Sequence, residues 1–368
     1  MNKAESHSVG DVLIVGAGAI GGVTGAILHA AKKDVCLVNR KSLHYKEVNK
    51  NGLIIEGYSE PFFVPIKSSV KELDRQFKHV LVTVKNLDTD SVMKDLKRYI
   101  SSESLVYSMQ NGFGNTEIME KHIPKNQIVA AVVGWGANKI APGKIRITSK
   151  TGDFVIGFED GQNTDDPRLK EVKDLLSLWR PTIVTDNILG YRWSKLVVNS
   201  VTSPISALLD ISIGEMFADE RVCKIMSAVK EEGIQVAESH NVKLEPVDGL
   251  KIRNFFYKPK PNDNLFTRTK GRIMSFIIAK AGAKRHGKIR SSLLWDLQQS
   301  RKTEIEFING YIVKKGKESK LETPLNSFLV KVVHELERGK RKIGLHNSEE
   351  LVNIARISSE KIKDQEKR

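Results

Sequence analysis

The sequence of 368 residues predicts an α/β domain followed by a mainly α-helical domain. Three observations support this prediction. A glycine-rich turn lies between an apolar run and a helical stretch near the N-terminus. Short apolar runs then alternate with helical stretches until about residue 185, and beyond residue 187 the apolar residues recur at helical spacing. We therefore expect two domains, residues 1–186 and 187–345, and a charged tail at 346–368.

The first expected element is the apolar run 11–15, which leads directly into the turn Gly16-Ala17-Gly18-Ala19-Ile20-Gly21. A stretch rich in small residues, 22–31, follows, so the order is strand, tight turn and helix. Here Gly16 permits the turn, Gly18 lets the backbone approach a pyrophosphate, and Gly21 lets the helix pack on the strand. The N–H groups that begin the helix would then face the phosphates. The pattern is typical of a Rossmann dinucleotide-binding domain; the alternative is a glycine-rich turn without a ligand.

The second expected strand, 34–38, ends at Asn39 and Arg40. A site that prefers NAD places an acidic residue at this point, where it binds the ribose hydroxyl groups. An arginine instead forms a charge-assisted pair with the 2′-phosphate of NADP. We therefore expect NADP(H) as the cofactor and Arg40 as a phosphate ligand, with an ordinary surface arginine as the alternative.

Further strands are expected at 54–55, 79–84 and 104–109, and their alternation with helical stretches indicates a parallel sheet. The carboxyl ends of parallel strands face the ligand crevice. Lys85 follows the second of these runs and Asn111 follows the third, so we expect both to face the cofactor or the substrate. The alternative for Asn111 is a role in shaping its own turn.

Short β-like runs separated by glycines between residues 128 and 158 predict additional strands before the domain closes. In the helical region, Lys195 and Asn199 lie four residues apart and therefore share one helix face. Burial would lower the pKa of such a lysine toward neutrality, which suits proton transfer to a carbonyl oxygen. The alternative is a lysine that extends along an amphipathic helix to reach water.

Glu304 lies in an apolar-periodic stretch that predicts a helix, directly after Arg301, Lys302 and Thr303. A salt-bridged helical carboxylate is the alternative to a functional role. Ser292 precedes Glu304 by twelve residues, which corresponds to about 18 Å along an unbroken helix. The two side chains can contact one small substrate only if Ser292 lies before the helix begins.

The formal net charge of +15 belongs to the last third of the chain, where residues 251–368 contain 28 Lys and Arg against 13 Asp and Glu. A basic region can attract anionic metabolites or nucleic acid, and it is also typical of a solvated helical surface. No recognisable nucleic-acid-reading motif accompanies it, so nucleic acid is not favoured as a partner. We interpret 255–263 as a loop, 281–290 as a mobile basic segment and 346–368 as a frayed tail.

Two cysteines, Cys36 and Cys223, provide neither a disulfide framework nor a zinc site, which fits a reducing compartment. We therefore expect a cytoplasmic protein without a metal site. The long uncharged stretch 12–28 contains five glycines, so the glycine-rich turn explains it better than a membrane segment does.

Together these features resemble the ketopantoate reductase family. The motifs that occur in the family's order, over about residues 10–345, are Gly16 to Gly21, Asn39-Arg40, Val84-Lys85, Gln110-Asn111-Gly112, Trp193-Ser194-Lys195 with Asn199, Arg301 to Ile305, and Ile308-Asn309-Gly310. The resemblance implies a Rossmann domain joined to a helical domain, with the active site in the cleft between them. It also implies NADPH-dependent reduction of 2-dehydropantoate to pantoate, a step of pantothenate biosynthesis.

The resemblance further implies roles for individual residues. Lys195 resembles the family's general acid, whereas Lys85 and Asn111 resemble its cofactor-side contacts, Asn111 also lying near the substrate. Asn199 and Ser292 resemble substrate ligands. Glu304 matches a glutamate near both cofactor and substrate.

Two positions depart from the family pattern, because Ser203 and Ile213 stand where the family has asparagine. Loss of an amide at a polar contact costs about 1–3 kcal/mol when its partner stays unsatisfied, which is enough to change substrate preference. A different branched or bulky 2-oxo acid is therefore an alternative substrate. A non-catalytic NADP(H)-binding regulator with a basic C-terminal surface is a second alternative. The expected partners are a small 2-oxo acid and, in a homodimer, a second copy of the chain; a membrane is not expected.

Overall fold

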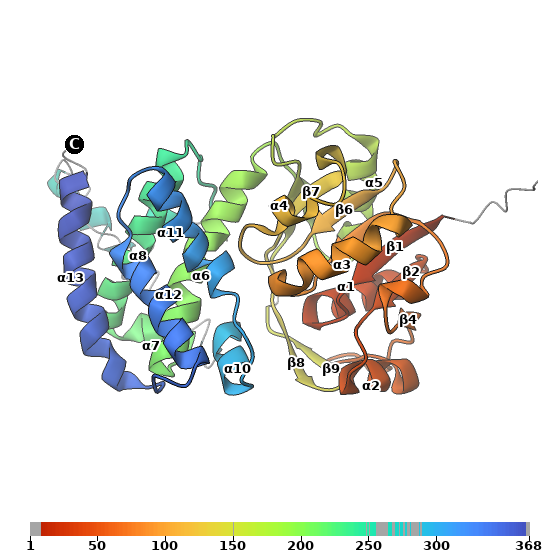
Figure 1. The fold of residues 1–368 in the computed structure, drawn as a ribbon, viewed down its shortest axis with the longest axis horizontal. Coiled ribbons are helices and arrows are strands. Elements are labelled where there is room, and N and C mark those ends of the chain that lie inside the picture. The colour runs from red at the N-terminus through yellow and green to blue at the C-terminus, as the bar shows by residue number, and fades with distance from the viewer. Residues whose placement is uncertain are drawn as a thin grey trace, which may run out of the picture. The chain divides into compact units, whose positions relative to one another are not determined.

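The computed structural model describes residues 9–149, 151–247, 249, 251–254 and 289–365, together with positions 264–266, 269–271, 273, 274, 277, 280 and 287. It divides into two compact units, Met1–Ile188 and Leu189–Arg368, each of which is described by itself (Figure 1). The division lies two residues beyond the predicted boundary. The expected loop at 255–263 and most of the basic segment 281–290 lie outside the described residues.

An eight-stranded sheet with the order β11-β10-β7-β6-β5-β1-β2-β4 forms the centre of the first unit. Its strands are β1 Gly10–Val15, β2 Val35–Val38, β4 Ile66–Lys67, β5 Phe77–Val82, β6 Leu105–Ser108, β7 Ile128–Val133, β10 Phe154–Gly157 and β11 Thr182–Val184. Pairing is parallel from β4 through to β7. The pairing of β10 with β7 is antiparallel, so β10 and its parallel neighbour β11 run the opposite way. The predicted α/β fold with a parallel sheet is confirmed.

The helices of this unit lie on both faces of the sheet. They are α1 Ala19–Ala30, α2 Leu43–Asn51, α3 Thr89–Leu96, α4 Asn115–Met119 and α5 Pro167–Ser177, with short 3₁₀ turns η1 Val70–Glu72, η2 Asn86–Asp88, η3 Lys97–Tyr99 and η4 Lys125–Gln127. Successive side chains of a strand point to opposite faces. Accordingly, Val12 and Ile14 pack in one buried cluster with α1 and α5, whereas Leu13 and Val15 pack in another with α3 and α4. Burial on both faces explains why β1 is a continuous apolar run.

A small second sheet accounts for the rest of the β-like sequence between residues 128 and 158. Strands β8 Ala137–Ala141 and β9 Lys144–Ile147 form an antiparallel hairpin, and β3 Ile54–Ile55 pairs in parallel with β9. The predicted additional strands therefore divide between two sheets, since β7 and β10 join the large one.

The second unit is mainly helical, as the apolar spacing predicts (Figure 1). Its described elements are α6 Ile188–Leu209, α7 Ile213–Ala218, α8 Glu220–Ser239, η5 Ile252–Asn254, α10 Ser292–Gln298, η6 Ile305–Phe307, α11 Asn309–Glu318, α12 Pro324–Glu337, η7 Leu345–Asn347 and α13 Ser348–Gln365. Within the part of the chain that the structure describes, no helix combines the length and the apolar character needed to cross a membrane.

The prediction of a frayed tail at 346–368 is wrong for residues 348–365, which form α13. Leu351 is fully buried, and Ala355 packs with it in a cluster that includes residues of α8 and α12. Ser358 is also fully buried. These three residues recur at helical spacing and form the narrow buried stripe of an otherwise charged helix. The high charge content of the segment concealed that stripe.

A buried polar network connects helices of this unit at the point where a proline interrupts the hydrogen bonding within α6. Pro204 lies inside α6 and has no N–H, so the carbonyl of Ser200 lacks its usual donor within the helix. The side-chain amide of Asn309 donates to that carbonyl at 3.0 Å and to Asn326 Oδ1 at 2.9 Å. Asn326 Nδ2 donates in turn to Glu232 Oε2 at 2.8 Å. The network therefore fixes α6 against α11, α12 and α8.

The same carboxylate fixes α13. Ser358 Oγ donates to Glu232 Oε1 at 2.6 Å, and the backbone N–H groups of Leu325 and Asn326, at the start of α12, donate at 2.9 Å each. Burial raises the pKa of Glu232, although these bonds favour the ionised form. Glu232 therefore connects α8 with the start of α12 and with α13.

Candidate active site

The cofactor-side residues predicted from the sequence meet at one edge of the large sheet. Strands β6, β5, β1 and β2 are neighbours and run parallel, so their carboxyl ends share an edge. The glycine-rich turn follows β1, Arg40 follows β2, Lys85 follows β5 and Asn111 follows β6. The strand order thus brings together residues that are far apart in the sequence.

The glycine-rich turn has the geometry that its motif predicts. Gly16 has a φ of +108°, and a Cβ at this position would lie 2.7 Å from the backbone nitrogen of Val84. A Cβ at Gly21 would lie 2.4 Å from the carbonyl oxygen of Gly16. At Gly18, by contrast, a Cβ would meet nothing closer than 4.0 Å. Gly16 and Gly21 therefore serve the fold, whereas Gly18 leaves open space beside the backbone.

The start of α1 suits an anion. Gly18 is the N-cap and provides no side-chain cap, and the first turn, Ala19 to Gly21, contains no acidic residue. The N–H groups of a helix N-terminus that lack side-chain acceptors attract phosphate. Ala17 is buried, and Ala19 and Ile20 are partly buried against the core.

Thr83, to which no motif in the sequence points, holds the turn in place. Its hydroxyl donates to the carbonyl of Gly16 at 2.6 Å. The N–H groups of Gly16 and Ala17 also donate to the carbonyl of Val38, at 2.8 and 3.1 Å. The turn is therefore bonded to the ends of both strands that flank β1. The only sequence signal for Thr83 is its position two residues before Lys85.

Positive charge gathers where β2 and β4 end. Arg40 is exposed, and its guanidinium Nη1 lies 3.9 Å from the carboxylate of Asp88, a long contact between two solvated side chains. Such pairs contribute little, so Asp88 competes weakly for the arginine. Lys41 follows in the chain, and Lys67 ends β4, where its carbonyl accepts from the N–H of Asn39 at 3.0 Å.

Side-chain amides join the loops that carry Lys85 and Asn111. Asn86 Nδ2 donates to the carbonyl of Asn111 at 2.6 Å, and Gln110 Nε2 donates to the carbonyl of Val84 at 3.0 Å. Lys85 is partly buried, whereas Asn111 is exposed. Asn86 lies outside the motifs found in the sequence, and Gln110 lies in one of them without a predicted role, yet both side chains hold these loops together.

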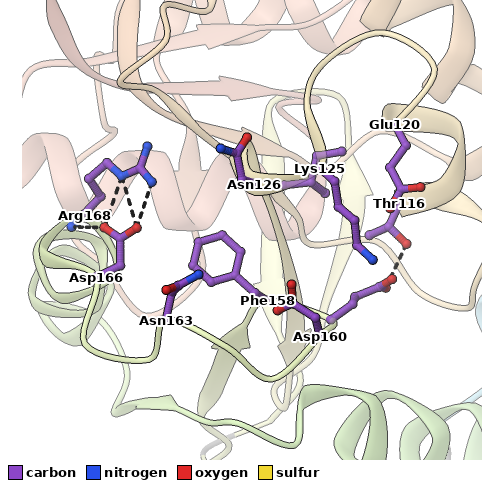
Figure 2. Close-up of a pocket in the computed structure, with 11 residues that line it drawn as sticks. Thr116, Glu120, Lys125, Asn126, Phe158, Asp160, Asn163, Asp166 and Arg168 are labelled. Carbon is purple, nitrogen blue, oxygen red and sulfur yellow. Dashed lines mark hydrogen bonds and ion pairs between the residues drawn. The ribbon is translucent and has the colours of Figure 1, made fainter.

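A separate surface cavity of about 420 Å³ lies at the opposite edge of the large sheet (Figure 2). Ile128, which begins β7, and Phe158, which follows the antiparallel β10, both line it. Among its polar groups, Arg168 is paired with Asp166 at 2.8 Å (Figure 2). The cavity is therefore distinct from the edge where the glycine-rich turn lies.

In the second unit, Lys195 and Asn199 share one face of α6, four residues apart. Ser194 anchors this part of the helix, because its hydroxyl donates to the carbonyl of Glu245 at 2.6 Å. Lys195 retains partial access to solvent, yet the protein around its ammonium group lowers its pKa to about 8 by desolvation. An ammonium group with this pKa is protonated at neutral pH and gives up its proton readily.

The prediction that Glu304 lies within a helix is wrong. Helix α10 ends before it, and Glu304 directly precedes the 3₁₀ turn η6. The chain leaves the helical path because the N–H of Arg301 turns back to the carbonyl of Asp296 at 2.8 Å. Two residues after Arg301, the N–H and the hydroxyl of Thr303 both donate to Glu337, at 2.8 and 2.7 Å. A distant carboxylate thus sets the local conformation.

His334 strengthens the same anchor. Its Nε2 lies 2.6 Å from Glu306, and its Nδ1 lies 2.8 Å from Glu337. Burial opposes a positive charge on His334, but the hydrogen bonds to the two carboxylates outweigh burial and raise its pKa. The segment that contains Glu304 is therefore fixed on both sides.

Ser292 is the first residue of α10, a helix that Ser291 caps by accepting from the N–H of Leu294 at 3.2 Å. The hydroxyl of Ser291 also donates to the carbonyl of Ser203 at 3.0 Å. Ser203 lies one turn of α6 beyond Asn199, so the start of α10 is attached close to the predicted substrate ligand. The spacing along a single helix that separated Ser292 from Glu304 does not apply.

The residues next to Ser292 and Glu304 share one apolar cluster. Leu293 and Ile305 are both buried in it, together with Ala207 of α6. Helix α10, η6 and α6 therefore pack around a common core. Within this unit the structure brings the elements that carry all four predicted residues together.

The two positions that depart from the family pattern lie at helix ends or kinks. Ser203 directly precedes Pro204, and Ile213 begins α7, where its N–H donates to the carbonyl of Ile289 at 2.8 Å. Both side chains are partly exposed. Neither can supply the amide that an asparagine would present.

Comparison with known proteins is consistent across sequence and structure. Residues 12–161 match the family model for ketopantoate reductase PanE/ApbA, and residues 187–337 match the model for its C-terminal part. The chain is 30% identical over 320 residues to the 2-dehydropantoate 2-reductase of Pyrococcus horikoshii, covering 86% of this chain and 94% of the relative. It is also 30% identical over 331 residues to the protein of the same name from Archaeoglobus fulgidus, covering 89% and 98%.

Solved structures agree. A PanE/ApbA family ketopantoate reductase from Ralstonia eutropha superposes with a TM-score of 0.72 at 25% identity, covering 90% of this chain and all of that one. A D-mandelate dehydrogenase in complex with NADH and anilino(oxo)acetate has the same fold, with a TM-score of 0.75 at 23% identity and coverage of 89% and 99%. The resemblance seen in the sequence is thus confirmed, and the chain belongs to the ketopantoate reductase family of oxidoreductases.

Proposed function

We propose that this protein reduces a 2-oxo acid with NADPH and that 2-dehydropantoate, which gives pantoate, is its principal substrate. The observation that supports this most directly is Lys195, whose pKa of about 8 suits a proton donor and whose helix face also carries Asn199. Membership of the family and the names of the relatives support the choice of substrate.

The carboxyl edge of the large sheet fits a dinucleotide. The open space at Gly18 and the absence of acid from the first turn of α1 suit a pyrophosphate. Arg40, with Lys41 and Lys67 close in the fold, suits the extra phosphate of NADP. Lys85 and Asn111 would contact the cofactor from the ends of β5 and β6. When bound, NADPH supplies the hydride that reduces the substrate carbonyl carbon.

In the mechanism we propose, Lys195 performs the proton transfer. As C2 of the substrate accepts the hydride, its oxygen becomes an alkoxide, and the ammonium group of Lys195 donates a proton to it. The product is a 2-hydroxy acid, and the neutral lysine then regains a proton from water. Desolvation suits this role, because it brings the pKa of the donor close to the working pH.

The remaining polar residues bind and orient the substrate. Asn199 and Ser292 would donate hydrogen bonds to its carboxylate and hydroxyl groups. Glu304, which its neighbours hold rigidly, would accept a hydrogen bond from a substrate hydroxyl. These groups would keep the carbonyl carbon fixed for the hydride and its oxygen close to Lys195.

Ser203 and Ile213 favour a second candidate substrate, because they replace amides with a short hydroxyl and an apolar side chain. An enzyme with the same mechanism but a different branched 2-oxo acid would suit such a site. Steady-state kinetics with NADPH and a panel of branched and aromatic 2-oxo acids decide between the two. The largest kcat/KM for 2-dehydropantoate supports the first proposal, and weak turnover of it beside strong turnover of another acid supports the second.

The same panel tests whether the protein is an enzyme of this type. NADPH binding without oxidation by any 2-oxo acid would contradict both proposals. A homodimer and a cytoplasmic location stay predictions. Measurement of the molecular mass in solution tests the first, and localisation of the tagged protein tests the second.

A further inference from the structure

A buried histidine bridges the glycine-rich turn and a distant hairpin. His44 lies in α2 with only 4% of its surface exposed. Its Nε2 lies 2.8 Å from the carbonyl oxygen of Ala17, which stands between the first two glycines of the turn. Its Nδ1 lies 3.0 Å from the backbone nitrogen of Gly143, in the turn between β8 and β9. One side chain thus joins three separate segments of the first unit.

The two partners fix the protonation state of the imidazole. The Gly143 N–H can only donate, so Nδ1 carries the lone pair, and the Ala17 carbonyl can only accept, so Nε2 carries the proton. An imidazolium ring would turn a second N–H toward the Gly143 N–H and lose that bond. Burial, together with the positive charge of Lys139 on β8, lowers the pKa of His44 against the opposing effect of the Ala17 hydrogen bond.

The bond to Ala17 affects the face of the turn that a ligand would meet. The oxygen of a peptide carbonyl carries a partial negative charge. The hydrogen bond holds the Ala17 oxygen toward His44 of α2. Without that bond the peptide between Ala17 and Gly18 can rotate, and a carbonyl oxygen that turns toward a bound phosphate repels it.

We propose that His44 is a positioning residue for the dinucleotide: its donor nitrogen fixes the Ala17 carbonyl, and so the backbone that receives the pyrophosphate, while its acceptor nitrogen anchors the ring to the β8–β9 turn. The inference rests on the proposed binding of NADPH at the glycine-rich turn. It adds a determinant of cofactor affinity that touches no ligand and lies outside every motif identified in the sequence.

Two substitutions separate the two hydrogen bonds. In His44→Asn the short amide presents an oxygen close to the position of Nδ1, so it can accept from Gly143 but cannot reach Ala17. In His44→Gln the longer amide reaches the position of Nε2 and donates to Ala17. We expect His44→Asn to raise the Kd of NADPH about tenfold and His44→Gln to raise it by less than about threefold.

The measurement is calorimetric titration of the purified full-length protein with NADPH, without substrate. The KM for NADPH should rise in His44→Asn while kcat at saturating NADPH stays within about threefold of the parent, since the reacting groups are unchanged. His79 provides a matched control, because it is 1% exposed in β5 of the same unit and lies 3.2 Å from the hydroxyl of Tyr107 rather than beside the turn. His79→Asn should lower the melting temperature and leave the Kd unchanged.

Equal Kd values for the parent, His44→Asn and His44→Gln would overturn the inference and leave His44 a purely structural residue. Equal weakening by His44→Asn and His79→Asn would overturn it as well, because the effect would then follow general destabilisation. If His44→Asn does not fold, His44→Leu, which fills a similar volume and removes both bonds, takes its place with the same expected rise in Kd. A parent protein that does not bind NADPH would instead refute the proposed function.

Discussion

The dependence of the reaction on pH tests the role of Lys195 most sharply. A pKa of about 8, set by desolvation, leaves the ammonium form dominant at neutral pH. About nine-tenths of Lys195 is then protonated one pH unit below its pKa and about one-tenth one unit above. If this group donates the proton, kcat/KM for reduction should be nearly constant below about pH 7 and fall about tenfold per unit above about pH 8 to 9.

Substitution of Lys195 measures how much the proton donor contributes to kcat. Lys195→Ala should lower kcat by about 10²–10⁴, the usual effect of removing an acid catalyst, and should leave the Kd of NADPH nearly unchanged. Glu304→Gln is the control: it keeps the shape, removes the charge and should divide its effect between KM and kcat without moving the pH profile. A Lys195→Ala enzyme within about threefold of the parent, or a flat profile through pH 8 to 9, would refute the mechanism.

Three further outcomes follow from the structure. Arg40→Asp should lower the preference for NADPH over NADH at least about tenfold, because the aspartate would repel the 2′-phosphate that Arg40 binds in the proposed site. An unchanged ratio of the kcat/KM values for the two cofactors contradicts this prediction. His334 has a raised pKa between its two carboxylates, so its stabilising effect is complete below its unfolded pKa of about 6.5 and disappears as the pH rises through the higher folded value. Denaturant titrations across this range should show the free energy of unfolding falling as the pH rises, and His334→Gln should remove that fall. Deletion of residues 346–368 uncovers the cluster that Leu351 fills and should cost at least about 2 kcal/mol of unfolding free energy, whereas an unchanged transition midpoint would contradict the packing of α13.

Local sequence predicted the parts of the fold whose determinants are local. The strand, turn and helix around Gly16 to Gly21 follow from residues within one short segment, and the structure has them where the motif places them. Lys85 and Asn111 were placed correctly at the sheet edge because the carboxyl ends of parallel strands always share an edge.

The features that the sequence did not predict depend on contacts between distant segments. The conformation of Thr303, directly before Glu304, is held by Glu337 of α12, and the order of the tail depends on the match between Ser358 and a buried carboxylate on α8. His44 bonds to Gly143, almost one hundred residues away along the chain. No periodicity or motif contains such pairings, so only the folded chain reveals them.

Hydride transfer to the carbonyl carbon of a 2-oxo acid can be tested by following the hydrogen itself. The purified protein is mixed with 2-dehydropantoate and NADPH that carries deuterium at the transferable position of the nicotinamide ring, and the product is examined by mass spectrometry and NMR. We expect pantoate with a single deuterium bound to C2 and none exchanged into water, formed in equal amount to the NADP⁺ released. Oxidation of NADPH without deuterium at C2, or no oxidation with this or any other 2-oxo acid, would contradict this expectation.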